Sequence, residues 1–105
     1  MDELLAIIRE IGLSSAYDHF AEGEVPQVPY LLYLIPANNN FAADNHAYFK
    51  INEVHIELYT DRKDLATEQQ IEAVLDRHCI FYEKTETWIE SEKLYEVLFI
   101  FDMEV

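Results

Sequence analysis

The stretch LYEVLFIFDME, residues 94–104, decides how this sequence folds. Two interleaved sets of side chains alternate through it with the period of two that is typical of a β-strand. A helix would scatter Phe99 and Phe101 among Glu96 and Asp102, so the pattern predicts a strand.

The strand period extends outward from this stretch to three earlier segments. Residues 80–85 are predicted to form a strand beside 94–104. Residues 30–35 are apolar on both faces and stop at Pro36, which indicates a strand near the centre of the sheet. Residues 48–60 are predicted as a further strand, with a β-bulge near 52–53 because the apolar residues change phase there.

Two helices are predicted from apolar stripes at helical spacing. Leucine and isoleucine residues place an apolar face on residues 3–11, and Gly12 supplies a left-handed stop. Residues 68–78 form the second helix, with Thr67 and Gln70 as a capping box at its start.

The intervening segments are predicted to be irregular. Residues 14–20 form one short helical turn, and residues 37–47 form a long polar loop with Phe41 inside it. Trp88 and Ile89 lie in a loop between the last two strands. The whole chain therefore reads as one domain, residues 1–105, of the α+β class. It has the order α-β-β-α-β-β, with two helices packed on one face of a four- to five-stranded, mainly antiparallel sheet.

Composition restricts the possible functions. Asp and Glu number 21 against 7 Lys and Arg, giving a net charge of −14, which opposes direct binding to nucleic-acid phosphates. Half of the residues are hydrophobic, so the chain has enough apolar side chains to fold. The acidic N-terminus and the single cysteine indicate synthesis inside the cell, and no apolar run is long enough to span a membrane.

Two groups of residues suggest chemistry at first sight. Glu53, His55 and Glu57 share one face of a strand, as metal ligands could, but no further ligands accompany them. We interpret them as a strand surface facing water or a neighbouring subunit. His78 and Cys79 are adjacent, yet neighbouring side chains point apart, so Cys79 is interpreted as a buried, reduced cysteine. We expect no metal, no cofactor and no enzyme activity.

Contact residues are expected where large side chains stand among polar ones. Phe41, Trp88, Ile89 and Tyr59 are the candidates for subunit or partner contact. A lone subunit gains little by keeping such groups in polar surroundings.

Several strings resemble one protein family. YFKINEVHIELYTDRKD (48–64), IEAVLD (71–76) and FYEKTETWIESEKLYEVLFIFDMEV (81–105) resemble tail terminator proteins of siphophages and prophages, also called tail completion or head-tail joining proteins. DELLAIIREIGLSSAYDHFAEGE (2–24) is similar to the start of such proteins.

The resemblance implies a small α+β subunit without enzyme activity that forms a ring, usually a hexamer. Such a ring caps the tail tube, ends its growth and joins it to the head connector. The implied partners are other copies of the chain, the major tail tube protein and the head-connector or stopper protein. The implied location is the tail or neck of the virion, assembled in the bacterial host cytoplasm. Glu86, Glu90 and Glu92 would then form an acidic surface near the channel, where they would repel passing DNA.

Three alternatives remain open from the sequence. The chain could be another phage neck protein, such as a head closure protein. It could be an acidic DNA mimic or inhibitor that binds a basic partner. A small metal enzyme using Glu53, His55 and Glu57 ranks last.

Overall fold

The computed structural model describes residues 2–43 and 47–104, and it describes the side chains of these residues except for 41–43 and 47–49. Its elements, in chain order, are α1 (Asp2–Ile11), β1 (Ser14–Tyr17), β2 (Tyr30–Asn38), β3 (Phe41–Ala43), β4 (Ala47–Phe49), β5 (Ile51–Thr60), α2 (Leu65–Arg77), β6 (Tyr82–Ile89) and β7 (Leu94–Glu104).

The main sheet has five strands in the order β1-β2-β5-β7-β6. β2, β5, β7 and β6 pair antiparallel with their neighbours, and only β1 pairs in parallel, with β2. The predicted α+β class and the order α-β-β-α-β-β are therefore confirmed. β5 holds the centre of the sheet, whereas β2, which was expected near the centre, is next to the edge strand β1.

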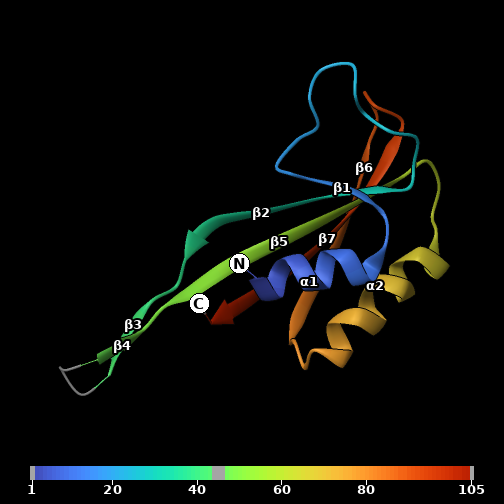
Figure 1. Cartoon of the computed structure of the whole chain (residues 1–105). Coiled ribbons are helices and arrows are strands. Elements are labelled where there is room, and N and C mark those ends of the chain that lie inside the picture. The colour runs from blue at the N-terminus through green and yellow to red at the C-terminus, as the bar shows by residue number, and fades with distance from the viewer. Residues whose placement is uncertain (1, 44–46, 105) are drawn as a thin grey trace.

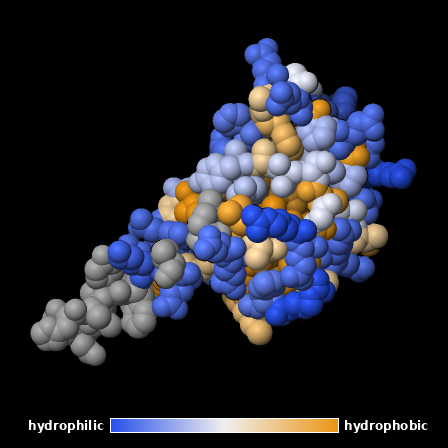
Figure 2. Space-filling model, viewed as in Figure 1, coloured by the Kyte–Doolittle hydropathy of each residue, from blue (hydrophilic) through white to orange (hydrophobic). Residues whose placement is uncertain are grey.

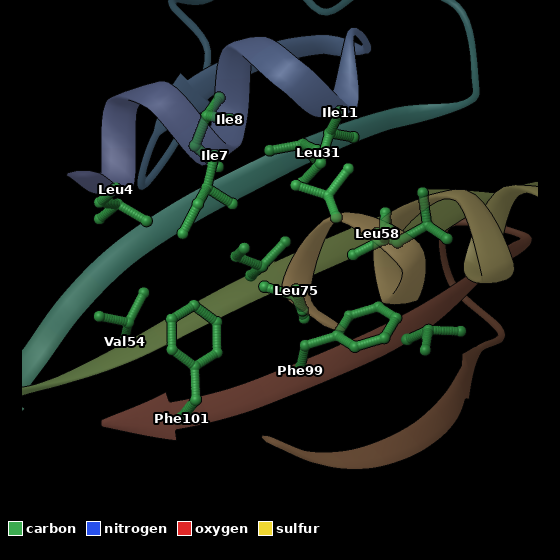
Figure 3. Close-up of a cluster of buried hydrophobic side chains, with 14 residues drawn as sticks. Leu4, Ile7, Ile8, Ile11, Leu31, Val54, Leu58, Leu75, Phe99 and Phe101 are labelled. Carbon is green, nitrogen blue, oxygen red and sulfur yellow. The ribbon is translucent and has the colours of Figure 1, made fainter. Parts of the chain in front are cut away.

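Both helices cover one face of this sheet and enclose the core (Figures 1 and 3). The alternation in β7 places Val97, Phe99 and Phe101 on that face, and Phe99 is fully buried. The remaining members of the core come from both helices and from β2 and β5: Leu4, Ile7, Ile8, Ile11, Leu31, Val54, Ile56, Leu58, Ile71, Val74 and Leu75.

The β5–β7 ladder is regular from the Ile51–Glu104 pair to the Thr60–Tyr95 pair. The bulge predicted at 52–53 is therefore wrong. Ile51 and Val54 both lie in this regular strand, so they point to opposite faces of the sheet without a bulge between them. The irregularity of this region is on the partner strand β2, where the register with β5 shifts between Leu34 and Ala37.

Helix α2 starts three residues earlier than predicted because Asp64, not Thr67, is its N-cap. The Asp64 carboxylate accepts from the backbone nitrogen of Thr67 at 3.1 Å and from its hydroxyl at 2.7 Å. Gln70 does not complete a capping box. Its side-chain amide donates to the carbonyl of Ile11 at 2.6 Å, which links α2 to the C-terminus of α1.

Residues 14–17 form the edge strand β1, so the helical turn predicted for 14–20 is wrong there. Gly12, at φ 83°, lets the chain leave α1 in a left-handed conformation that costs glycine little. β1 then pairs with β2, and the Tyr17 hydroxyl accepts from the backbone nitrogen of Ile35 at 3.0 Å. Pairing with a neighbouring strand supplies hydrogen bonds that a single isolated turn lacks.

The loop predicted for 37–47 is also largely strand. β2 continues to Asn38, and β3 pairs antiparallel with β4 as a two-stranded extension beyond the main sheet (Figure 1). Phe41 lies in β3, but its side chain, with its predicted contact role, lies outside what the structure describes, as do residues 44–46.

Candidate interaction surface

The face of the sheet opposite the helices carries a regular array of half-buried side chains. Cross-strand register places Leu32 of β2 beside Glu57 of β5, and Leu98 of β7 on the other side of Glu57. The next row has the same form, with His55 between Leu34 and Ile100. A polar stripe along β5 is thus bordered by two aliphatic columns.

The polar stripe consists of Glu53, His55, Glu57 and Tyr59, which alternate along β5 as the sequence indicated. The His55 ring lies 2.8 Å from the Glu53 carboxylate, and this contact lowers the pKa of Glu53. Among the residues that the structure describes, no group of three or more His, Cys, Asp or Glu side chains has an arrangement that could hold a metal ion.

Tyr59 joins two carboxylates on this face. Its hydroxyl lies 2.9 Å from Oε1 of Glu57 and 2.7 Å from Oε2 of Glu96, which comes from β7. Burial raises the pKa of Glu57, and burial together with the two carboxylates raises the pKa of Tyr59. Burial thus disfavours the charged form of Glu57.

An aromatic cluster closes one end of the face. The Tyr59 ring stacks on Tyr30 with 5.3 Å between ring centroids, and Phe20 meets Tyr30 edge-on at 5.4 Å. Tyr30 is accordingly 9% exposed although no helix covers it. This packing explains why the sequence of β2 is apolar on both faces.

Trp88 and Ile89 lie at the end of β6, not in a loop as predicted. β6 is an edge strand and its side chains are mostly exposed, so it lacks the apolar alternation that revealed β7. Trp88 is 41% exposed, meets Tyr95 at a ring-centroid distance of 4.7 Å, and donates to Glu90 at 2.6 Å. It remains an accessible aromatic contact group.

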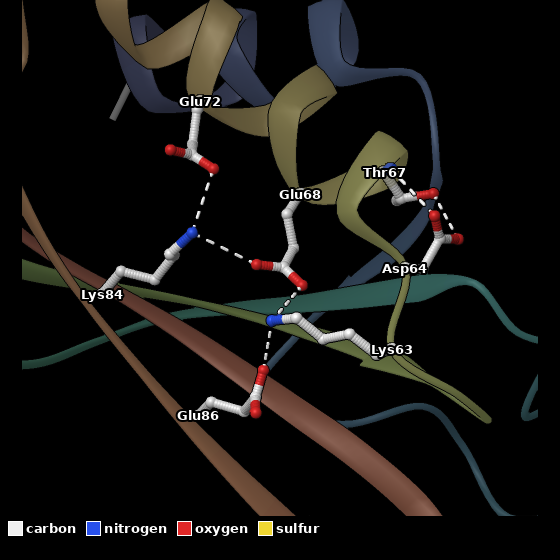
Figure 4. A network of polar contacts seen from close by, with 7 residues as sticks. All are labelled: Lys63, Asp64, Thr67, Glu68, Glu72, Lys84 and Glu86. Carbon is white, nitrogen blue, oxygen red and sulfur yellow. Dashed lines mark hydrogen bonds and ion pairs between the residues drawn. The ribbon is translucent and has the colours of Figure 1, made fainter.

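Glu86, Glu90 and Glu92, the acids expected near a channel, do not form one patch of unpaired charges. Glu86 is paired with Lys63, in a network that also holds Glu68, Glu72 and Lys84 between α2 and β6 (Figure 4). Lys93 and then Trp88 lower the pKa of Glu90 by direct contact. Glu92 lies in the turn between β6 and β7.

Cys79 is exposed, so its predicted burial is wrong. It follows the C-terminus of α2 at φ 56°, a left-handed position that redirects the chain toward β6. The neighbouring His78 ring lies 3.1 Å from the Glu10 carboxylate of α1. His78 therefore links the end of α2 to α1, which is a structural role.

Phe81 is an exposed aromatic that the sequence did not single out. It is 87% exposed just before β6 and helps to line an open pocket with Cys79 and Asp102. The sequence placed it inside the strand predicted for 80–85, but β6 begins only at Tyr82, so Phe81 lies outside the strand. Figure 2 shows one face of the molecule, which is mostly hydrophilic with scattered hydrophobic patches.

These elements define a small α+β protein with two helices on one face of a mixed five-stranded sheet. Within the described residues, neither helix is long and apolar enough to cross a membrane. No protein-family model matches the sequence, and no curated protein matches it.

The fold is similar to that of a chain in a solved structure, the virion of a native gene transfer agent (GTA) particle. The TM-score is 0.60 at 14% sequence identity, and the alignment covers 94% of this chain and 83% of that chain. At this identity the likeness shows a shared fold over nearly the whole chain.

Proposed function

We propose that this chain is a structural, non-enzymatic subunit of a phage or phage-derived particle. The observation that carries the proposal is the fold shared with a virion chain over 94% of the present chain. A gene transfer agent virion is a particle of assembled subunits, and a subunit of this kind needs contact surfaces and no catalytic cleft.

Within such a particle, we propose the role of tail terminator. The subunits would form a ring, six-fold by the family resemblance of residues 48–64 and 81–105, on the last ring of the tail tube. The ring would meet the major tail tube protein on one side and the head connector on the other. Its place would be the tail or neck of the virion.

Two features of the subunit support a ring. In the described residues the main sheet ends in an edge strand on each side, β1 and β6, and these two different surfaces are suited to head-to-tail contacts between copies. The net charge of −14 would keep DNA from adhering as it passes through the bore.

The test is disruption of the gene in the phage or prophage that encodes the chain. We expect full heads and overlong or abnormal tails that fail to join, with normal particles restored by a plasmid copy. Normal virions from the disrupted phage would contradict the role. Tight one-to-one binding to a basic enzyme would favour the acidic inhibitor instead.

A further inference from the structure

The face opposite the helices has the composition of a docking surface. Glu57 is held between the side chains of Leu32 and Leu98, all three half-buried, and no helix of the described chain packs on them. Interfaces commonly combine aliphatic contacts with a few placed polar groups, and this face offers both.

The polar groups at its centre, Glu57, Tyr59 and Glu96, include no lysine or arginine. The Tyr59 hydroxyl has one proton, but it lies within hydrogen-bond distance of both Glu57 and Glu96. It can donate to only one of them at a time, which leaves the other carboxylate facing an oxygen lone pair. Glu57 and Glu96 together therefore lack one hydrogen-bond donor.

Several carboxylates elsewhere in the molecule have a lysine or arginine as their partner. Glu68 contacts both Lys63 and Lys84, and Glu10 contacts Arg77. Within the described part of the chain, neither Glu57 nor Glu96 forms an ion pair with a lysine or arginine, and Tyr59 is the hydrogen-bond partner they share.

We propose that this face docks onto another protein through an arginine or lysine of that protein, which inserts between Glu57 and Glu96. Apolar side chains flanking the cation would pack on Leu32 and Leu98. The incoming cation supplies the missing donors, and a guanidinium can serve both carboxylates at once.

The occupant is a different protein and not a second copy of this chain. A second copy carries the same net charge of −14 and would be repelled, whereas a basic protein would be attracted. An identical face would bring two more carboxylates and no lysine or arginine. The site would serve equally in a tail terminator or in an inhibitor of a basic protein.

The test uses the full chain and the peptide acetyl-Leu-Arg-Leu-amide, followed by NMR. We expect saturable shifts centred on Tyr59 and a fall in the pKa of Glu57 on binding. The same peptide with citrulline, which has the shape of arginine without its charge, should not bind. Glu57→Gln and Glu96→Gln should each weaken binding about tenfold, because each leaves the cation one carboxylate short.

Glu104→Gln is the matched control. Glu104 is exposed at the far end of the same strand as Glu96, so its substitution removes the same charge at a distance from the site. It should leave the affinity unchanged. Equal losses in all three variants, equal binding of the citrulline peptide, or no saturable shift at Tyr59 would overturn the proposal.

Discussion

An Oε2 atom of Glu68 lies 2.8 Å from the Nζ atom of Lys63, although only 1% of the Glu68 side chain is exposed. Lys84 of β6 approaches the other carboxylate oxygen at 3.2 Å. A buried acid thereby fastens α2 both to the turn after β5 and to the edge strand (Figure 4). This network stabilises the helix side of the molecule.

Glu68→Ala should lower the free energy of unfolding by about 2 kcal/mol, because it removes the charged contacts that a buried carboxylate makes with Lys63 and Lys84, although each lysine keeps a second carboxylate partner. Urea denaturation monitored by circular dichroism measures the change. Glu86→Ala is the control, since Glu86 also pairs with Lys63 but is 41% exposed. It should cost less than about 1 kcal/mol. Equal losses in the two variants would contradict the assignment.

Asp64→Ala should destabilise the protein by about 1 kcal/mol through loss of the N-cap of α2. Asp64→Asn should retain most of the stability, because its side-chain oxygen can still accept from Thr67. The hydrogen bonds from Thr67 lower the pKa of Asp64, so the part of its contribution that depends on its charge is present above the ordinary pKa of 3.8 and is lost as the pH falls through the lowered value. Unfolding measured at several acid pH values tests this, and an advantage of the native protein over Asp64→Asn that persists unchanged at the lowest pH would refute it.

Glu57→Gln should stabilise the free subunit at neutral pH. Burial raises the pKa of Glu57, and Glu96 and Asp18 oppose its charge while Tyr59 and His55 favour it. The folded state therefore loses stability as the pH rises from the ordinary value of 4.5 through the raised pKa. The advantage of the variant should grow over that interval and then level off. The control Glu104→Gln corrects for the lower net charge, and an equal gain from it would exclude a special role for Glu57.

Assembly should depend on salt. Subunits of charge −14 repel one another, and salt screens that repulsion, so the protein should be monomeric at low ionic strength and associate as salt or tail tubes are added. Sedimentation velocity measures the mass. Trp88→Ala should block association while lowering stability only slightly, because the side chain is 41% exposed.

Leu65→Ala, at a 57% exposed site on α2, is the control for that experiment and should assemble normally. Loss of assembly in both variants would show that Trp88 has no particular part in it.

The sequence predicted the elements whose side chains alternate between core and solvent. The strand predicted for 94–104 has the same bounds as β7, and the helix predicted for 3–11 begins one residue later than α1. Both predictions succeeded because each element has one clearly apolar face. β1 and the end of β6 were missed. Both are edge segments stabilised by pairing with a neighbour, and such pairing leaves little trace in a local pattern.

Only part of the candidate site could be predicted from the sequence. The period of two places Glu57 and Tyr59 on one face, and this follows from sequence alone. Glu96 joins them only because β5 and β7 pair in the register that sets Tyr59 opposite Glu96. The register between strands that are distant in sequence depends on the packing of the whole core. The contact of the Tyr59 hydroxyl with both Glu57 and Glu96 therefore could not be predicted from the sequence.

The proposed role, a ring-forming terminator of a tail tube, is tested by electron microscopy of particles that carry a gold-labelled copy of the protein. We expect label at the head-proximal end of every tail, with a closed ring of copies at that position in averaged images. Label spread along the tube, or particles that lack the protein altogether, would contradict it.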